Sequence, residues 1–407
     1  MKVFMVDLLR DYNISYTEFI NEINAISLKK FIYCQDPKDV FLYLVKSLAF
    51  GKEVVLLDGD WSITELEYQG LNHNKIKEIY SINSKINNIE DLYNKIEENK
   101  ENWSVSLFTS GTTGKPKKVK HSFSSASRAV RQSKKYRDNI WLFSYNPTHF
   151  AGLQVFLQAF MNRNTVVICN DPNKYNIDFL LNNYNITHIS ATPTFYRFIL
   201  PTINNEYDSI KNITLGGEKM DENLKSLLAK KFPAAKITNV YASTEAGNLF
   251  ASDGVYFNVE DHMADMIKIE DSELCVHRKI MGEFNFDNND MWYKTGDIVE
   301  YLNGKIKFLQ RESDFINVGG YLVNPSEVEE EILKIENIID VLVYGMDNKI
   351  VGKILAADVV LATKEENIHK KIFVYLNNKL QKWKIPRIIN IKETIEKTHT
   401  GKKVRKI

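Results

Sequence analysis

The sequence predicts an α/β protein with a large N-terminal domain, followed by a small C-terminal domain of the α+β class. Through roughly the first 250 residues, short apolar runs of strand length alternate with helix-length segments, which is typical of mainly parallel sheets covered by helices. Residues 251–310 change to short alternating runs separated by Gly and Asn, which predicts a small antiparallel, barrel-like sheet. From about residue 313, helix and strand segments predict a compact α+β unit.

The N-terminal elements follow from apolar periodicity and helix-start signals. Residues 80–102, rich in Asn, Lys and Glu, are predicted to form a solvated helix or connector. Strands are predicted at 53–58, 103–108, 141–145, 164–169, 188–192, 213–215 and 237–241. Helices are predicted at 39–50, 152–161, 175–184 and 221–232, the last with Asp221 as its N-cap, and helix starts at 62–66, 122–135 and 193–200.

The C-terminal elements are predicted in the same way. An acidic helix at 325–334 is capped by Asn324 or Ser326. Strands are expected at 338–343 and 354–361, and a helix at 368–381.

Composition bounds the function of the chain. A net charge of +1 over 407 residues, with 44% hydrophobic and 26% charged residues, is typical of a soluble globular protein and argues against electrostatic nucleic-acid binding. The cysteines, Cys34, Cys169 and Cys275, lie far apart and form neither a metal-binding pattern nor a disulfide framework. Neither a secretory signal nor an apolar stretch of membrane-spanning length is apparent, so a reducing, cytoplasmic location is expected.

The stretch 109–117, Thr-Ser-Gly-Thr-Thr-Gly-Lys-Pro-Lys, is the strongest chemical signal in the chain. Its glycines, hydroxyl side chains and lysines, placed after a predicted strand, suit the wrapping of a polyphosphate. Its spacing fits neither a Walker A loop nor a dinucleotide fingerprint. An ordinary polar turn is the alternative. The residues predicted to bind phosphate are Thr109, Ser110, Gly111, Thr112, Thr113, Gly114 and Lys115.

Further motifs follow this loop in a fixed order. They are Asn-Pro-Thr-His-Phe-Ala-Gly-Leu at 146–153, Leu-Gly-Gly-Glu at 215–218, Tyr-Ala-Ser-Thr-Glu at 241–245, Tyr-Lys-Thr-Gly-Asp at 293–297 and Thr-His-Thr-Gly-Lys-Lys-Val-Arg at 398–405. Together they resemble the adenylate-forming enzymes: acyl-CoA synthetases, adenylation domains of peptide synthetases, and luciferases. The resemblance spans roughly residues 40 to 407. It implies that ATP, Mg²⁺ and a thiol are used.

The resemblance assigns roles to particular residues. Glu245 would bind Mg²⁺, a hard cation that prefers oxygen ligands, and Thr244 would contact the α-phosphate. Asp297 and Arg311 would hold the ribose, and His149 would lie beside the acyl pocket. The adenine would lie against Tyr241, Gly216, Gly217 and Glu218, and the thiol channel would be lined by Gly319 and Gly320.

Lys402 is the predicted catalytic lysine, because a cation that reaches both the carboxylate and the α-phosphate would offset their repulsion. The motif register selects Lys402 over Lys403, although a basic, disordered tail would have the same composition. Each other role has a structural alternative. His149 and Tyr241 could fill the core, Glu245 could cap a helix, and Asp297 could belong to a turn.

The segment 310–320 resembles the domain junction of these enzymes, where a mobile small domain rotates between two half-reactions. The predicted division is a large domain at 1–310, a hinge at 311–313 and a small domain at 314–407. Ala242 replaces the usual glycine, and Ser313 replaces the usual hinge Asp or Lys. The short N-terminal region before the phosphate loop resembles short acyl- or aryl-CoA synthetases, including the succinylbenzoate–CoA ligase type.

The predicted activity is an ATP-dependent carboxylic acid–thiol ligase that forms an acyl-adenylate and transfers the acyl group to coenzyme A. One alternative is a stand-alone adenylation enzyme that loads the phosphopantetheine of an acyl carrier protein. A more distant alternative is a catalytically inactive nucleotide-binding sensor. Residues 146–149 hold no acidic side chain that could anchor a substrate amine, which disfavours an α-amino acid. The identity of the acid and the oligomeric state stay open.

Overall fold

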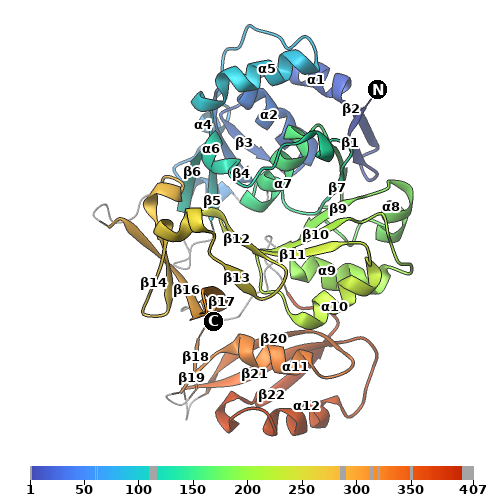
Figure 1. The fold of residues 1–407 in the computed structure, drawn as a ribbon, viewed down its shortest axis with the longest axis vertical. Helices are drawn as coiled ribbons and strands as arrows, with labels where there is room; N and C mark the ends of the chain where they lie inside the picture. Colours follow the sequence, from blue (N-terminus) through green and yellow to red (C-terminus); the bar gives the residue numbers. More distant parts are fainter. Residues whose placement is uncertain are drawn as a thin grey trace.

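The computed structural model describes residues 2–59, 61, 63–109, 117–284, 290–311, 315–318, 321–348 and 352–396. Figure 1 shows their arrangement, with the N-terminal α/β part at one end and the C-terminal part at the other. Two mainly parallel sheets and one antiparallel sheet form the large part of the molecule, and smaller sheets follow in the C-terminal part. This architecture confirms the predicted fold class.

An eight-stranded sheet in the order β12-β11-β10-β9-β7-β8-β1-β2 is the centre of the large part. Its six inner strands are parallel, and β2 and β12 pair antiparallel at the two edges. The strands are β1 Val3–Asp7, β2 Tyr12–Ser15, β7 Ile140–Phe143, β8 Thr165–Ile168, β9 His188–Ala191, β10 Asn212–Gly216, β11 Lys236–Ser243 and β12 Gly247–Ser252. The carboxyl ends of the parallel strands therefore share one edge.

The helices between these strands agree with the predicted ones. They are α7 Phe150–Met161, α8 Ile177–Asn183, α9 Pro193–Ile199 and α10 Glu222–Lys231. The Asp221 side chain accepts a hydrogen bond from the Leu224 amide at 2.8 Å, which confirms the predicted N-cap of α10. The buried faces of α7 and its neighbours join one continuous core with the central sheet.

The second sheet, in the order β3-β4-β5-β6, carries the approach to the predicted phosphate loop. Its strands are β3 Phe31–Cys34, β4 Glu53–Asp58, β5 Ser104–Thr109 and β6 Lys117–Ser122. The first three are parallel, and β6 returns antiparallel to β5. The helices of this part are α1 Tyr16–Ala25, α2 Pro37–Ala49, α3 Ile63–Tyr68, α4 His73–Ile76 and α5 Ile89–Asn99.

Two predictions in this part need correction. The region 80–102 is not fully solvated, because α5 buries Leu92 and Ile96 in the core. The helix expected from residue 122 is a single turn, α6 Phe123–Ala126, followed by a 3₁₀ turn at Lys134–Tyr136. The helix does not continue through residue 131, because the backbone groups of Arg131 form hydrogen bonds with a side chain of another helix. Gln158 of α7 accepts from the Arg131 amide at 2.8 Å and donates to the Arg131 carbonyl at 2.9 Å.

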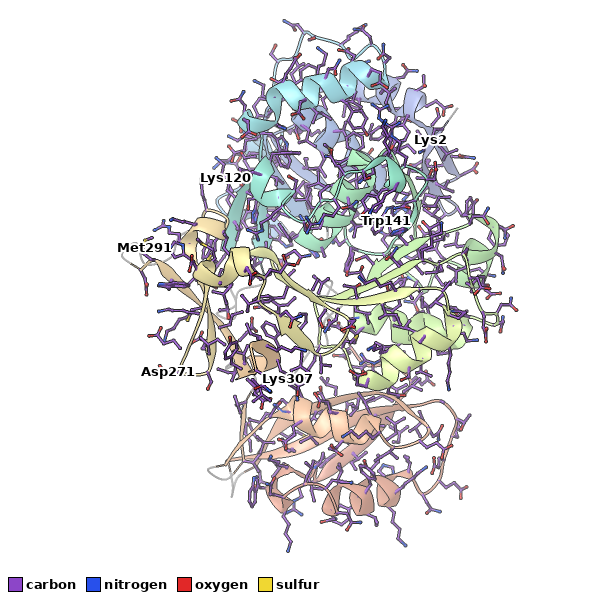
Figure 2. All side chains as sticks on the ribbon, in the orientation of Figure 1. Lys2, Lys120, Trp141, Asp271, Met291 and Lys307 are labelled. Atoms are coloured by element: carbon purple, nitrogen blue, oxygen red, sulfur yellow. The ribbon has the colours of Figure 1, made fainter. Side chains whose placement is uncertain are left out.

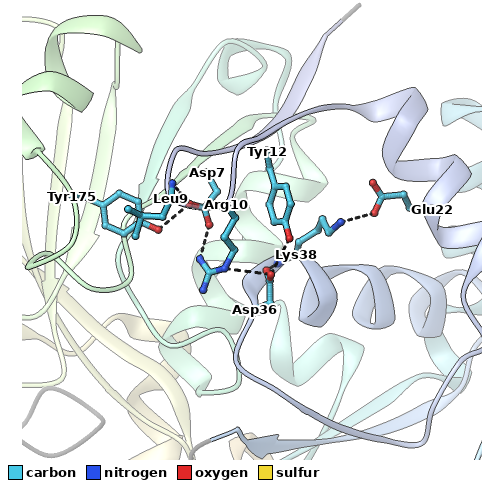
Figure 3. A network of polar contacts seen from close by, with 8 residues as sticks. All are labelled: Asp7, Leu9, Arg10, Tyr12, Glu22, Asp36, Lys38 and Tyr175. Atoms are coloured by element: carbon cyan, nitrogen blue, oxygen red, sulfur yellow. Dashed lines mark hydrogen bonds and ion pairs between the residues drawn. The ribbon is translucent and has the colours of Figure 1, made fainter.

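Residues 3–15, for which no elements were predicted, form a hairpin whose first strand, β1, extends the central sheet beside β8. A polar network fixes this hairpin (Figure 3). The Asp7 carboxylate, 1% exposed, accepts from the Leu9 amide at 3.0 Å, Arg10 Nη1 at 2.6 Å and the Tyr175 hydroxyl at 3.0 Å. Arg10 Nε also lies 3.3 Å from Asp36, so the hairpin is tied both to the loop before α8 and to the start of α2.

The predicted antiparallel region is a five-stranded sheet in the order β13-β17-β16-β15-β14, with its own hydrophobic cluster. Its strands are β13 Tyr256–Asn258, β14 Ile267–Glu270, β15 Glu273–His277, β16 Trp292–Leu302 and β17 Lys305–Arg311. Figure 1 shows this sheet beside the central sheet. Tyr241 and Phe250 of the central sheet contact Phe308 of β17, which joins the two sheets.

The C-terminal part has a separate core. It comprises α11 Pro325–Leu333, α12 Ile368–Asn377 and the sheet β20-β21-β22, with strands Ile338–Asn348, Gly352–Leu361 and Ile388–Lys392, plus the short pair β18 Ile316–Val318 and β19 Tyr321–Val323. Asn324, not Ser326, is the N-cap of α11. β20 runs five residues beyond its predicted end, because its pairing with β21 continues to Asn348.

The end of α12 and the contact between the two parts complete the fold. α12 ends four residues before the predicted position, where i→i−3 bonds of Asn378 and Lys379 tighten the last turn.

An ion pair between Lys219, which follows the glycine turn after β10, and Glu330 of α11 links the large part to the C-terminal part. Over the described ranges, no helix has the length and apolar character needed to cross a membrane.

Candidate active site

The predicted site residues of the central sheet gather at the carboxyl ends of its parallel strands. Gly216 pairs with Val240 across β10 and β11, so the glycine turn after β10 and the motif at 241–245 leave neighbouring strands side by side. His149 follows β7, and Thr192 follows β9, at the same edge. Open α/β sheets bind their ligands in the crevice outside this edge. The topology therefore brings together motifs that are almost 100 residues apart in the sequence.

The glycine turn has the backbone freedom that its predicted role requires. Gly217 has φ +81°, a left-handed conformation that favours glycine. A Cβ built on Gly217 would lie 3.8 Å from Thr192 Cγ2, so this turn already lies close to the start of α9. Glu218 points to the same place, since its Oε2 accepts from the Thr194 amide at 3.1 Å. The turn is thus anchored to α9 through Glu218.

Tyr241 and Asp297 meet although they belong to different sheets. The Tyr241 hydroxyl donates to Asp297 Oδ2 at 2.5 Å, and its ring stacks on Phe308 with centroids 3.8 Å apart and planes at 16°. Asp297 is only 7% exposed and lies opposite Arg311 in the β16–β17 ladder. Stacking on Phe308 covers one face of the Tyr241 ring, so core packing is part of its role. The proposed ribose carboxylate and adenine tyrosine are therefore neighbours.

The residues Thr244 and Glu245 lie in the turn that joins β11 to β12. This turn leads directly into β12 and no helix begins there, so the alternative in which Glu245 caps a helix is wrong. Glu245 is half-buried, and its backbone carbonyl accepts from the Gly282 amide at 2.8 Å. The Thr244 carbonyl accepts from the buried His121 ring at 2.7 Å.

His149 is not a plain core histidine. It occupies the N-cap position of α7 without capping that helix through its side chain, and its Nε2 lies 3.0 Å from Asp58 Oδ2. The His149 side chain is 23% exposed and that of Asp58 12%. Asn146 donates to the other oxygen of Asp58 at 3.4 Å. Asp58 comes from the carboxyl end of β4 in the second sheet, so this contact bridges the two sheets at the predicted acyl pocket.

The predicted phosphate loop begins within the described residues and then leaves them. Thr109 ends β5, and its buried hydroxyl has no hydrogen-bond partner among the residues that the structure describes. The β5–β6 pairing closes with Thr109 opposite Lys117, so both ends of the loop are fixed. The side chain of Arg311 lies outside the described part, as do the following predicted residues: Ser110, Gly111, Thr112, Thr113, Gly114, Lys115, Ser313, Gly319, Gly320 and Lys402.

The described residues fit a nucleotide with a magnesium ion. In the described part of the chain, no group of three or more His, Cys, Asp or Glu side chains could hold a metal. A cation bound here would therefore rely on Glu245 together with phosphate oxygens and water, which is how Mg²⁺ is commonly held. The buried Thr109 hydroxyl, at the start of the loop, offers a donor for a phosphate oxygen. When bound, the ion would neutralise charge on the phosphates.

Sequence reasoning missed several residues that shape this site. His121 lies on β6 with its ring fully buried against the 244–248 turn, and burial lowers its pKa to about 4. Arg128 donates to backbone carbonyls of the same turn, and burial lowers its pKa. Asp58 contacts His149, and Phe308 stacks on Tyr241. A signal existed only for Asp58, a carboxylate at the end of a predicted parallel strand, where functional side chains gather.

A glycine turn, a stacked tyrosine and a buried aspartate at the carboxyl edge of a parallel sheet form the kind of crevice in which α/β enzymes bind nucleotides. The profile of AMP-binding enzymes matches residues 36–268, and that of the AMP-binding enzyme C-terminal domain matches residues 327–402. The chain belongs to the AMP-binding enzyme family.

Several curated relatives are 2-succinylbenzoate–CoA ligases. The one from Bacillus subtilis is 29% identical over 339 residues, which cover 74% of this chain and 67% of the relative. The one from Staphylococcus aureus (strain MRSA252) is 28% identical over 325 residues, covering 73% and 64%. The one from Listeria monocytogenes is 26% identical over 336 residues, covering 74% and 70%. The aligned part thus spans about two thirds of each relative.

Solved structures share the fold over nearly the whole chain. The o-succinylbenzoate CoA synthetase of Bacillus subtilis, solved with its acyl-adenylate intermediate, superposes with a TM-score of 0.70 at 21% identity, covering 99% of this chain and 94% of that one. ATP-bound MatB from Rhodopseudomonas palustris superposes with a TM-score of 0.71 at 16% identity, with the same coverage. At these identities the likeness establishes the fold.

Proposed function

We propose that this protein is an AMP-forming carboxylic acid–thiol ligase. A carboxylate attacks the α-phosphate of MgATP, pyrophosphate leaves, and coenzyme A then takes the acyl group from the acyl-adenylate and releases AMP. The observation that carries the proposal is the convergence of the glycine turn at 216–218, the motif at 241–245 and buried Asp297 at one sheet edge. The names of the curated relatives support the same reaction class.

The roles of the site residues are part of the proposal. The loop from Thr109 to Lys115 holds the β- and γ-phosphates, Glu245 binds Mg²⁺, and Thr244 contacts the α-phosphate. Asp297 and Arg311 bind the ribose beside Tyr241. Lys402 lies between the carboxylate and the α-phosphate and offsets the charge that develops there. The hydrogen bond from Tyr241 to Asp297 supports this arrangement, because it fixes the carboxylate next to the ring that adenine would contact.

The acid to test first is 2-succinylbenzoate, the substrate named for the curated relatives. His149, held by Asp58, is proposed to border the acyl pocket, and Ala242 to narrow it. Phe150 supports this placement, because a Cβ built on Gly247 would lie 3.3 Å from its ring. The start of α7 and the β11–β12 turn therefore pack against each other at Phe150 and Gly247.

We further propose that residues 1–310 and 314–407 act as two units about a hinge at 311–313. The separate hydrophobic core of the C-terminal part supports this division, and the Lys219–Glu330 ion pair is a polar contact that a rotation could exchange. Cysteines that are free, with Cys169 and Cys275 buried, support a reducing compartment, and cytoplasm is the proposed location.

The test is acid-dependent exchange of labelled pyrophosphate into ATP, measured with 2-succinylbenzoate and a panel of other carboxylic acids. The expected result is exchange with one class of acid, followed by thioester formation when coenzyme A is added. Thioester formation only on a purified acyl carrier protein would replace coenzyme A as the acceptor. ATP binding without exchange for any acid would contradict the ligase and favour a nucleotide sensor.

A further inference from the structure

Consecutive backbone carbonyls of the turn after β11 are each held by a donor from another segment. His121 Nε2 lies 2.7 Å from the Thr244 carbonyl, and the Gly282 amide donates to the Glu245 carbonyl at 2.8 Å. Arg128 Nη2 donates to the Ala246 carbonyl and, at 3.3 Å, to that of Asn248. These contacts leave the side chains of Thr244 and Glu245 out of the bonding that fixes the turn.

The His121 ring is a fixed donor. A carbonyl oxygen can only accept, so Nε2 carries the hydrogen, and Nδ1 accepts from the Ser125 hydroxyl at 2.8 Å. The ring is fully buried, and burial lowers its pKa to about 4, so the neutral form with this tautomer persists near neutral pH. Ser125 lies in the single helical turn, α6, that follows β6.

Arg128 reaches the turn through a gap that only glycine leaves open. Gly247 has φ +72°, and a Cβ placed there would lie 3.0 Å from Arg128 Nη2. The other guanidinium nitrogen, Nη1, donates to the Ile280 carbonyl at 2.8 Å. Arg128 therefore links the β11–β12 turn to the 278–284 segment. The same segment contains Gly282, whose amide donates to the Glu245 carbonyl. A Cβ on Gly282 would come within 2.8 Å of His121 Cε1, so this approach also requires glycine.

The same donors connect the turn to the β5–β6 hairpin, which carries the predicted phosphate loop between its two strands. His121 lies on β6, which starts at Lys117, where that loop ends. Lys120, labelled in Figure 2, exchanges backbone hydrogen bonds of 2.8 and 2.7 Å with Glu283. The β5–β6 hairpin, the 278–284 segment and the 244–248 turn thus form one bonded frame.

We propose that His121 and Arg128 are positioning residues that hold Thr244 and Glu245 at a fixed place relative to the β5–β6 hairpin, whose residues Thr109 and Lys117 bound the phosphate loop. This inference rests on the proposed function. Charge on the phosphates is stabilised best by groups that are already in place, because moving them during the reaction costs free energy. A frame that holds the turn by its main chain meets this need while Thr244 and Glu245 keep their side chains for the nucleotide.

The test uses four variants and one matched control in the full chain. His121→Leu and Arg128→Met remove the donors, whereas His121→Gln and Arg128→Lys keep a donor of similar reach. His188→Gln is the control, because His188 is also a buried histidine, and the ring contacts seen for it among the described residues are with side chains away from the turn. The readouts are the Kd of MgATP by calorimetry and the hydrogen–deuterium exchange of peptides that cover 241–250.

We expect the Kd of MgATP to rise about tenfold in His121→Leu and Arg128→Met, which corresponds to the loss of roughly one hydrogen bond. Amide exchange in the 241–250 peptides should rise in the same two variants, with recovery in His121→Gln and Arg128→Lys and no change in His188→Gln. Unchanged MgATP affinity together with unchanged exchange in both removal variants would overturn the inference. Failure of the wild type to bind MgATP would instead overturn the proposed function on which it rests.

Discussion

His121 and His188 are both buried histidines whose pKa burial lowers to about 4, but their rings contact different parts of the molecule. His188 begins β9, so it lies at the amino edge of the central sheet. Its ring nitrogens contact side chains, Thr187 at 2.8 Å, Asn212 at 3.0 Å and Asn139 at 3.4 Å. His121 instead contacts the main chain of the turn that carries Thr244 and Glu245.

The different contacts of the two histidines show which buried residues should affect stability alone and which should also affect function. Burial and protonation behave alike for the two histidines, so their contributions to folding should be similar. Only His121 bonds to a segment at the carboxyl edge, where the proposed nucleotide site lies. Substitutions at the amino edge should therefore change stability alone, and substitutions of the residues that hold the turn should change both stability and nucleotide binding.

The largest expected effect belongs to the turn itself. Glu245→Gln should lower the rate of pyrophosphate exchange by about 10²–10³-fold, because a carboxylate ligand of the magnesium ion is lost from a preorganised site. The thermal midpoint should stay within a few degrees of the wild type. Glu222→Gln, at the start of α10, is the matched control and should leave the rate unchanged. A Glu245→Gln enzyme with full activity would remove Glu245 from the proposed magnesium site.

The next effect concerns stability at a network that shares the carboxyl edge but contains none of the proposed site residues. Asp7→Ala should cost about 3 kcal/mol of unfolding free energy, because the partners of a buried carboxylate lose their acceptor. The Kd of MgATP should not change. Asp36→Ala should cost less, since that carboxylate is 23% exposed. A weaker MgATP affinity in Asp7→Ala would show that the edge as a whole, rather than the turn, controls binding.

The two histidines should also shape the pH dependence of stability. Their folded pKa of about 4 lies below the unfolded value of about 6.5, so the unfolded state binds more protons between these limits. Stability should therefore fall as pH decreases from about 6.5 to about 4, by at most about 3 kcal/mol for each histidine. Denaturant titrations across this pH range should show a smaller change of unfolding free energy with pH in His121→Gln and in His188→Gln than in the wild type. If the unfolding free energy changed equally with pH in all three proteins, neither histidine would be the source of the pH dependence.

The smallest expected effect lies at the acyl pocket. Asp58→Asn removes the charge beside His149 but keeps a side chain of the same shape, so the KM for the acid should rise only about 3–10-fold. The Kd of MgATP should not change, because the Asp58 side chain contacts Asn146 and His149 beside the proposed acyl pocket. Initial rates over a range of acid concentrations would measure this. An altered MgATP affinity with unchanged KM for the acid would move the Asp58–His149 pair away from the acyl pocket.

Local pattern was sufficient to predict most of the fold. The strand at Glu53–Asp58 and the Asp221 cap were predicted at their observed positions, because apolar periodicity and capping are local signals. The hairpin at residues 3–15 was not predicted, because its position depends on pairing with β8, more than 150 residues away. The short helix at 123–126 was over-predicted for a related reason, since Gln158 competes for the peptide groups that follow.

For the candidate site too, local motifs predicted some residues, and residues that depend on distant contacts were missed. Motif spacing pointed to Tyr241, Glu245 and Asp297, and the structure brings Tyr241 and Asp297 into hydrogen-bond contact. Motifs gave no role to His121 or Arg128, whose function depends on contacts with carbonyl groups over 100 residues away. Any residue type offers such a carbonyl, so no sequence pattern marks the partner. Supporting residues of this kind become visible only when the fold is known.

The most direct test of the central claim follows one oxygen atom. When the carboxylate attacks the α-phosphate, one of its oxygens becomes the bridge of the acyl-adenylate, and thiol attack on the carbonyl then releases that oxygen with AMP. A carboxylic acid labelled with ¹⁸O, incubated with MgATP, coenzyme A and enzyme, should therefore yield AMP that carries one labelled oxygen by mass spectrometry. Lys402→Ala should nearly abolish this product, whereas Lys403→Ala should retain it. Thioester formed with unlabelled AMP, or with ADP in place of AMP, would contradict an acyl-adenylate mechanism.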